Sequence, residues 1–118
     1  MELKLLVVIV DEDKSSTVID AAREAGATGA TIINNVRGHG STSRKTFLGL
    51  NLEGRRDVML FLVSAERAAG IMEAVCAAGE FEDEAGTGIA IQLDVEAAVG
   101  LRHQLAGMLD NPEDGGNA

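Results

Sequence analysis

The sequence predicts an α+β domain in which a strand–helix–strand unit occurs twice around an antiparallel sheet. Two continuous apolar runs, Leu3–Val10 and Val58–Val63, are rich in branched side chains and have the length of buried strands. Each run is followed by a segment whose apolar residues have helical spacing, and these segments end near Gly26 and Gly79. A chain of 118 residues, 46% of them hydrophobic, is long enough to bury one core without disulfides.

The first half of the chain is expected to contain two strands and one helix. After the strand Leu3–Val10, Asp11-Glu12-Asp13 offers a helix cap and negative charge for a first helical turn. A helix is predicted over Ser15–Ala25, because one face of it collects the apolar residues Val18, Ile19, Ala22 and Ala25. Thr28-Gly29 then turns the chain into a second strand, Ala30–Val36.

The second half is expected to repeat this order. A third strand, Asp57–Ser64, leads into an alanine-rich helix over Ala65–Ala78, whose predicted apolar face consists of Ala68, Ile71, Met72, Val75 and Cys76. An acidic connector, Glu80–Ala85, then leads to Gly86-Thr87-Gly88 and to a fourth strand, Ile89–Asp94.

The end of the chain carries weaker signals. A short turn or helix is expected over Val95–Val99, and Gly100-Leu101-Arg102 is a candidate extension of the sheet. No apolar residue except the final alanine follows Leu109, so Asp110–Ala118 is expected to be a disordered tail. One folded domain is therefore predicted over residues 1–109.

The order β-α-β, loop, β-α-β is the ferredoxin-like arrangement, an antiparallel sheet backed by two helices. Two helices cover only one face of such a sheet. The first and third strands are nevertheless apolar on both faces, so we expect the second face to be buried by self-association.

The segment Arg37–Arg56 between the second and third strands differs from the rest of the chain. Glycines and serines interrupt it, so a long loop is predicted. It holds five of the ten basic residues and one of the nineteen acids, in a chain whose net charge is −9. A basic loop on an acidic body attracts anions or an acidic partner. The residues expected to contact a partner are Arg44, Lys45, Phe47, Arg55 and Arg56; Phe47 has packing onto the body as its alternative.

Composition excludes several classes of function. A net charge of −9 argues against nucleic-acid binding, and the absence of Trp and Tyr argues against stacking on bases. The single cysteine, Cys76, favours a reducing cytoplasm and core packing. No apolar run is long enough to span a membrane, and the start lacks a signal-peptide pattern. No set of nucleophile, base and orienting residue emerges, so an enzyme is not expected.

Three short motifs occur in an order that resembles the PII signal-transduction family and its PII-like relatives. The first is Ala25-Gly26-Ala27-Thr28-Gly29-Ala30-Thr31 followed by Arg37-Gly38-His39-Gly40, which is similar to the start of the family's long T-loop. The second is Ala78-Gly79 with Gly86-Thr87-Gly88, which looks like the nucleotide-binding B-loop. The third is Asp94-Val95 with Arg102, which stands at the second arginine of a C-terminal R-x-R motif. The resemblance covers about residues 3–103.

The resemblance implies a homotrimer that binds adenine nucleotides in clefts between subunits and docks its T-loop, here about residues 38–56, on a transporter or an enzyme. The ligand-binding residues it implies are Thr31, Gly38, His39, Gly40, Gly86, Thr87, Gly88 and Arg102. Ile89 and Gly100 stand where the family has basic residues, and Ser41 and Thr42 replace the arginine and glutamine that open its T-loop. No metal site and no firmly bound cofactor are expected; ATP, ADP or AMP is the candidate ligand.

Two other functions remain open at this point. The acidic connector is the one feature that favours a ferredoxin-like module for tolerance of divalent metals, although its acids lack the spacing of a calcium loop. The missing basic residues at Ile89 and Gly100 favour a protein-docking scaffold whose nucleotide cleft is degenerate.

Overall fold

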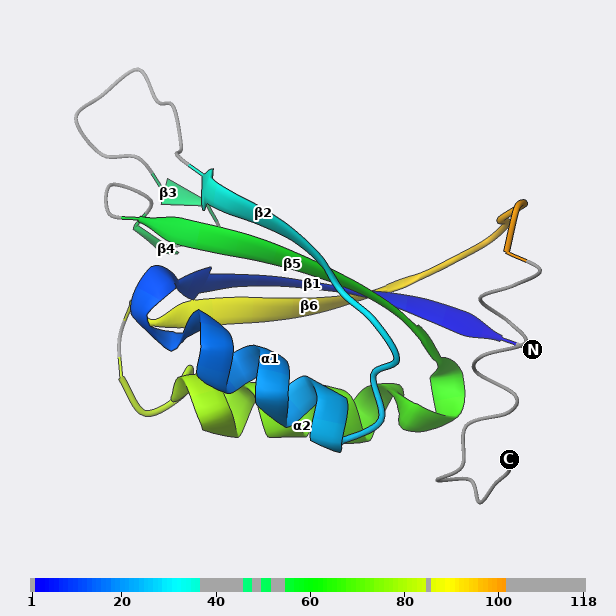
Figure 1. The fold of residues 1–118 in the computed structure, drawn as a ribbon, viewed down its shortest axis with the longest axis horizontal. Coiled ribbons are helices and arrows are strands. Elements are labelled where there is room, and N and C mark those ends of the chain that lie inside the picture. Colours follow the sequence, from blue (N-terminus) through cyan, green and yellow to red (C-terminus); the bar gives the residue numbers. More distant parts are fainter. Residues whose placement is uncertain (1, 37–45, 48–49, 52–54, 85, 102–118) are drawn as a thin grey trace.

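A computed structural model describes residues 2–36, 46–47, 50–51, 55–84 and 86–101 (Figure 1). The elements follow one another as β1 (Leu3–Asp11), the short 3-10 helix η1 (Glu12–Lys14), α1 (Ser15–Glu24), β2 (Thr31–Val36), β3 (Thr46–Phe47), β4 (Leu50–Asn51), β5 (Arg56–Ser64), α2 (Ala65–Gly79) and β6 (Gly88–Asp94). The four main strands and the two longer helices that the sequence predicts are all present, with boundaries shifted by about one residue.

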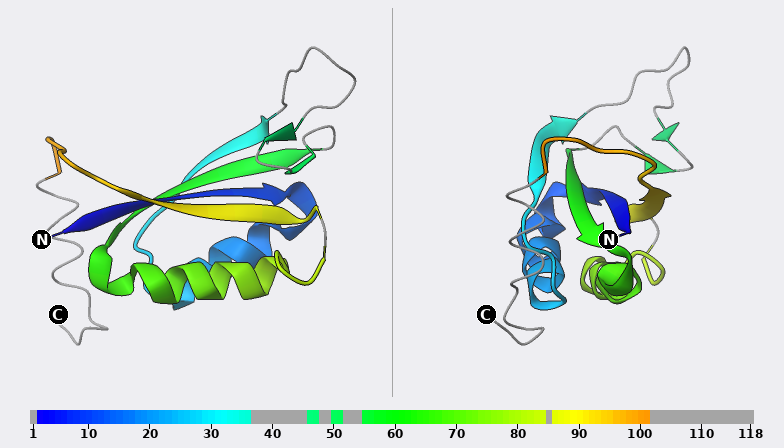
Figure 2. Two further views of the ribbon diagram at one scale, coloured as in Figure 1. Left: turned by 180° about the vertical axis from the view of Figure 1, so that it is seen from behind. Right: turned by 90° about the vertical axis from the view of Figure 1, so that its right-hand side faces the viewer.

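The main sheet has four strands in the order β2-β5-β1-β6, and each neighbouring pair is antiparallel. Two strand–helix–strand units therefore interlock, because β1 and β5 lie side by side in the centre while β2 and β6 form the edges. The predicted ferredoxin-like α+β fold is confirmed. Both helices lie on the same face of the sheet in Figures 1 and 2.

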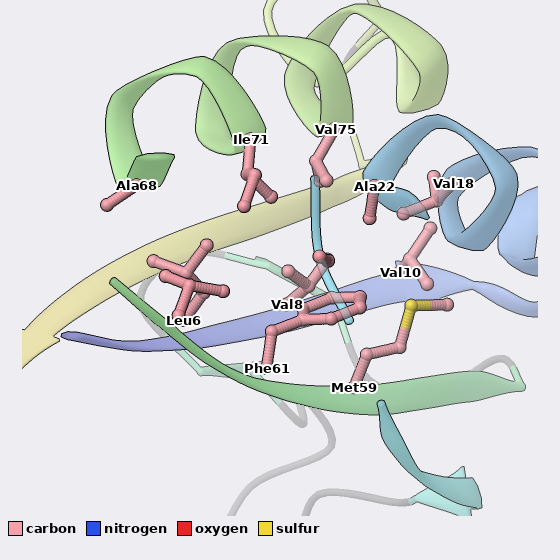
Figure 3. Close-up of a cluster of buried hydrophobic side chains, with 12 residues drawn as sticks. Leu6, Val8, Val10, Val18, Ala22, Met59, Phe61, Ala68, Ile71 and Val75 are labelled. Atoms are coloured by element: carbon pink, nitrogen blue, oxygen red, sulfur yellow. The ribbon is translucent and has the colours of Figure 1, made fainter. Parts of the chain in front are cut away.

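The core lies between that face and the two helices (Figure 3). Alternate residues of β1 and β5 point toward the helices, as the period of a strand requires. Their fully or almost fully buried partners from the helices are Val18, Ala22, Ala68, Ile71 and Val75, which meet Leu6, Val8, Val10, Met59, Phe61 and Val63. The predicted apolar faces of both helices are therefore confirmed except at Cys76, with Ile19, Ala25 and Met72 at the margin of the core. Cys76, which was predicted to pack in the core, is only half-buried and is not part of this cluster, because it lies at the edge of the buried helical face.

Neither α1 nor α2 lies on the opposite face of the sheet, and we call this face the open face. Strand register places its residues opposite one another in rows such as Ile33–Val58–Ile9–Ile89 and Leu62–Leu5–Leu93. Between these rows lie Val7, Leu60 and Ile91. Ile33 and Leu93 are 48% and 46% exposed, whereas the central Ile9 is 7% exposed. Among the described residues, no helix covers this almost wholly apolar sheet face, and its edge residues are exposed.

The predicted loop Arg37–Arg56 is in part regular, which corrects the prediction. Thr46–Phe47 and Leu50–Asn51 pair as an antiparallel two-stranded sheet, β3-β4, and Arg56 is the first residue of β5. The sheet ends at Asp94, and Val95–Leu101 forms neither a helix nor a strand. The predicted tail, Asp110–Ala118, lies outside the described residues, so the domain boundary stays a prediction.

Candidate functional site

One end of the sheet brings together the two segments that the sequence singled out. The end of β1, the start of β5 and the turn Gly86–Gly88 meet there, and we call this meeting point the junction. The backbone N–H of Asp11 donates to the carbonyl of Thr87 at 2.9 Å. The N–H of Glu12 donates to the carbonyl of Arg55 at 3.2 Å. The exit of the basic segment is thus tied, through β1, to the turn that precedes β6.

Arg56 occupies the centre of the junction and is only 9% exposed. Its guanidinium lies 3.7 Å from the Asp11 carboxylate and donates to the carbonyl of Gly86 at 3.4 Å. A third bond, at 3.3 Å, goes to the carbonyl of Arg55. Because a buried charge is tolerated only when it is paired and hydrogen-bonded, these contacts explain how an arginine fits at this position. Arg56 therefore holds the turn and the strand together within the chain, whereas Arg55 is exposed and pairs with Glu12 at 3.6 Å.

Asp57 points to the other side of the sheet, toward the start of α1, because successive strand residues face opposite ways. It is 4% exposed, and its carboxylate accepts a 2.5 Å hydrogen bond from the hydroxyl of Ser15, the first residue of α1. The strand that leaves the basic segment is thus fixed to the first helix as well as to the turn. Hydrogen bonds to an ionised group are among the stronger ones, so this contact stabilises the position of α1.

The turn itself is organised by Thr87, which is 7% exposed. Its hydroxyl lies 3.0 Å from the carbonyl of Glu80 and 3.3 Å from that of Glu84, and it donates to this pair of oxygens. Gly86 adopts a φ of +82°, which favours glycine, and the space around it is open. Gly88 is required for a different reason, because a Cβ there would lie 2.6 Å from the carbonyl oxygen of Ile9 and would clash with the edge of the Phe81 ring.

The connector before the turn is acidic and exposed. α2 ends as Glu80 adopts the left-handed conformation, with φ at 57°, while Gly79 is buried against the Phe81 ring. Glu80 pairs with Lys14 at 3.3 Å. Glu82, Asp83 and Glu84 are exposed and take part in none of the ion pairs between described residues.

The predicted ligand-binding residues are distributed over both edges of the sheet. Gly86, Thr87 and Gly88 lie at the start of the edge strand β6, while Thr31 begins the opposite edge strand, β2. Three strand spacings separate these edges, a distance of about 14 Å. The two groups are therefore not neighbours within one sheet. Six further predicted residues lie outside the described part of the chain: Gly38, His39, Gly40, Arg44, Lys45 and Arg102. Phe47 lies in β3.

Sequence reasoning missed three residues of the junction: Asp11, Ser15 and Asp57. Asp11 and Ser15 were expected only to start a helix, and Asp57 only to start a strand. The one available signal was a charged Arg56-Asp57 pair at the start of a strand that is otherwise apolar, since charges in such positions require partners.

The far end of the sheet holds a separate charged group. The Lys4 ammonium donates to Asp94 at 2.5 Å and to Glu2 at 3.3 Å. The hydrogen bond to Asp94, followed by that to Glu2, raises the pKa of Lys4 above its usual value of 10.5. This cluster fastens β6 to β1 and lies at the opposite end from the junction.

Comparison with known families decides the identity of this fold. The family model of nitrogen regulatory protein P-II matches residues 3–104. The chain belongs to the PII family. The resemblance inferred from the motifs is thus confirmed, and the chain is a PII-like signalling protein by family.

Solved structures agree with this membership. The CPII protein of Thiomonas intermedia K12, solved with ADP, AMP and acetate, has a TM-score of 0.63 at 23% identity, over 86% of this chain and 93% of its own. A putative PII-like signaling protein of Thermus thermophilus has a TM-score of 0.58 at 25% identity, over 80% and 87% of the two chains. Comparison with curated protein sequences gives no match. Neither α1 nor α2, the described α-helices, has the length and apolar character needed to cross a membrane.

Proposed function

We propose that this chain is a non-enzymatic, cytoplasmic regulator that senses an adenine nucleotide beside the turn Gly86–Gly88 and responds through its basic segment. The observation that carries the proposal is the junction. It links the exit of the basic segment, at Arg55 and Arg56, to the turn Gly86–Gly88, whose sequence resembles the family's nucleotide-binding loop. A ligand that contacts the turn can therefore bias the start of β5 through bonds that already exist.

The regulator acts as a homotrimer under this proposal, assembled through the open face. Its apolar rows would expose Val7, Leu60 and Ile91 to water in a monomer, and burying such a surface is the dominant drive for association. Assembly also supplies what one chain lacks, because Thr31 of one protomer can then approach the Gly86–Gly88 turn of another.

The trimer is tested by replacing Val7 with lysine at the centre of the open face. The expected result is a monomer by light scattering at micromolar concentration, with the helical circular dichroism retained. The matched control is Glu73→Lys, which changes an exposed position on α2 and should leave a trimer. A wild-type protein that is itself monomeric under these conditions contradicts the proposal.

Nucleotide binding is tested by thermal unfolding with ATP, ADP and AMP, with and without magnesium. A ligand present at about 100 times its dissociation constant adds about 2.7 kcal/mol to the free energy of unfolding. The proposal expects at least one nucleotide to raise the melting temperature and Gly86→Val to abolish that rise. An unchanged melting temperature with every nucleotide contradicts it.

The target of the response is proposed to be an acidic surface of a transporter or a metabolic enzyme, contacted by Arg44, Lys45, Phe47 and Arg55. The charge of this segment, against a chain of net charge −9, supports the choice. Arg56 has a different part in this proposal, since its burial makes it a link within the chain. Replacing Arg44 and Lys45 with alanine is expected to weaken capture of the target and leave the melting temperature unchanged.

A docking scaffold without a nucleotide is the second candidate. It is favoured by Ile89, which replaces the family's lysine and lies on the open face beside Ile9. Thermal unfolding distinguishes the two candidates, because the melting temperature of a scaffold does not change when a nucleotide is added. No comparable observation favours the metal-tolerance module, since no three His, Cys, Asp or Glu of the described residues are grouped to hold an ion.

A further inference from the structure

One buried cation, Arg56, holds three segments of the junction together. Its guanidinium faces the carboxylate of Asp11 at 3.7 Å and donates to the carbonyls of Gly86 and Arg55 at 3.4 and 3.3 Å. The first acceptor ends β1, the second belongs to the turn before β6, and the third lies at the exit of the basic segment (Figure 1). Because a buried charge that loses an acceptor is costly, the three segments are stable together and unfavourable apart.

The end of β1 adds a second link between the same segments. The backbone N–H of Asp11 donates to the carbonyl of Thr87 at 2.9 Å, and the next N–H, that of Glu12, donates to the carbonyl of Arg55 at 3.2 Å. The Asp11 carboxylate is fixed in turn, because it accepts from the N–H of Asp13 at 3.2 Å. Two successive amides thus hold the turn and the exit of the basic segment against one strand end.

The connector before the turn joins these contacts through Thr87. The Thr87 hydroxyl donates to the carbonyls of Glu80 and Glu84 at 3.0 and 3.3 Å, while the Thr87 carbonyl accepts from Asp11. The Glu84 N–H donates to the same Glu80 carbonyl at 3.0 Å. A continuous path of contacts therefore runs from Glu84, through the turn and the end of β1, to Arg56.

The connector is the part of this path that opens most easily. Glu82, Asp83 and Glu84 are exposed, and Phe81 is the connector side chain that packs against the core. Segments with few buried apolar contacts open locally at a free energy well below that of global unfolding. β1 lies instead between two strand partners and carries buried side chains. Opening of the junction is therefore expected to begin in the connector and to leave β1 in place.

We propose that Arg56 is a positioning residue that makes the connector Glu80–Glu84 and the exit of the basic segment open and close in one step. When the connector leaves, Arg56 loses the Gly86 carbonyl, and Arg55 and Arg56 are released from the end of β1 with it. Linkage makes the effect reciprocal, so a partner that holds the exit in place also closes the connector. The role in signalling rests on the proposed function, whereas the coupling itself needs no nucleotide.

Amide hydrogen exchange of the full, nucleotide-free chain, followed by NMR under native conditions, tests the coupling. The amide of Glu84 reports on the connector, that of Asp11 on the turn, and that of Glu12 on the exit of the basic segment. One-step opening predicts that the opening constants of these amides agree within about 3-fold and depend on urea alike. The amide of Val8, in the middle of β1, reports on global unfolding.

The variant Arg56→Met keeps an apolar stem and removes the guanidinium. It is expected to speed exchange of the Glu84 amide by about 10-fold. Thr87→Val is expected to speed exchange of the Glu12 amide by about 10-fold in the wild-type chain and by less than about 2-fold in the Arg56→Met background, where the link is already lost. The matched control is Arg55→Met, which removes an exposed cation paired with Glu12 at 3.6 Å and should leave exchange at Glu84 unchanged.

The outcomes separate this inference from the proposed function. Unequal opening constants in the wild type, an unchanged Glu84 amide in Arg56→Met, or an equal change in Arg55→Met overturns the coupling and leaves nucleotide binding standing. Exchange of Val8 that rises as much as that of Glu84 also overturns it, because Arg56 then stabilises the whole fold. If Arg56→Met fails to fold, the wild-type comparison decides. A melting temperature that no nucleotide changes contradicts the proposed function and leaves the coupling standing.

Discussion

A substitution at Gly88 tests whether glycine is required there for packing or for ligand binding. A Cβ at this position would lie 2.6 Å from the carbonyl oxygen of Ile9 and 2.8 Å from Cζ of Phe81. The Ile9 carbonyl belongs to the central strand β1, so it cannot move without disturbing the sheet. Gly88→Ala is therefore expected to destabilise the protein without any ligand, by about 1–3 kcal/mol, as overpacking of a well-packed site does.

Gly70→Ala is the matched control for Gly88→Ala. Gly70 lies within α2, and nothing lies within 4 Å of a Cβ built there. Alanine in a helix interior is favoured over glycine by about 1 kcal/mol, so this variant is expected to be more stable than the wild type. The same chemical change should thus have opposite signs at the two positions.

The assay is urea unfolding followed by circular dichroism, because the chain has neither Trp nor Tyr. The expected difference between the two variants is about 2–4 kcal/mol in the free energy of unfolding. If Gly88→Ala is as stable as the wild type, the close contact with Ile9 and Phe81 is not what requires glycine. Loss of nucleotide binding at unchanged stability would then assign Gly88 to the ligand.

Three further changes probe the junction and the far end of the sheet. Ser15→Ala should lower the free energy of unfolding by about 1–3 kcal/mol, because the buried Asp57 carboxylate loses the hydrogen bond from the Ser15 hydroxyl at 2.5 Å. A denaturant titration measures this change, and an unchanged unfolding midpoint would show that the hydrogen bond contributes nothing to stability. Thr87→Val keeps the shape of the side chain but removes its hydrogen bonds to the carbonyls of Glu80 and Glu84. The rate of amide hydrogen exchange in the connector should therefore rise by about 10-fold. An unchanged exchange rate would show that the Thr87 hydroxyl does not hold the connector in place. The raised pKa of Lys4 adds stability that is fully present below about pH 10.5 and lost as the pH rises through the higher folded value. Asp94→Asn should therefore have a lower melting temperature than the wild type at pH 8 and a similar melting temperature well above pH 11. A difference in melting temperature that grows with pH would contradict this expectation.

The sheet and the core were predictable because their signals extend over many residues. The apolar runs that form β1 and β5 have no interruption, so they identify buried strands without knowledge of their partners. The helical faces around Val18 and Ile71 repeat over several turns. The sequences of β1 and β5 also predicted that the second face of the sheet is apolar. A strand buried on one side only would alternate between apolar and polar residues, and these two strands do not.

The junction was not predictable because its contacts join residues that are distant in the sequence. Ser15 and Asp57 are 42 positions apart, and Arg56 and Gly86 are 30 apart. No local pattern encodes such a pair. Arg56 also illustrates a boundary effect, because beginning the strand one residue earlier converts an expected surface arginine into a buried one.

The hairpin β3-β4 was missed for a different reason. Each strand has two residues, which is too short for an alternating pattern to be recognised. The glycines of this segment indicated a loop, and the pairing of Phe47 with Leu50 has no periodic sequence to announce it.

Native mass spectrometry of the full chain, with AMP and with ATP, tests assembly and ligand together and is the most direct measurement of the proposed function. The proposal predicts a trimer that takes up as many as three copies of at least one of the two nucleotides. A monomer that retains no nucleotide would contradict both the proposed trimer and the proposed sensing site.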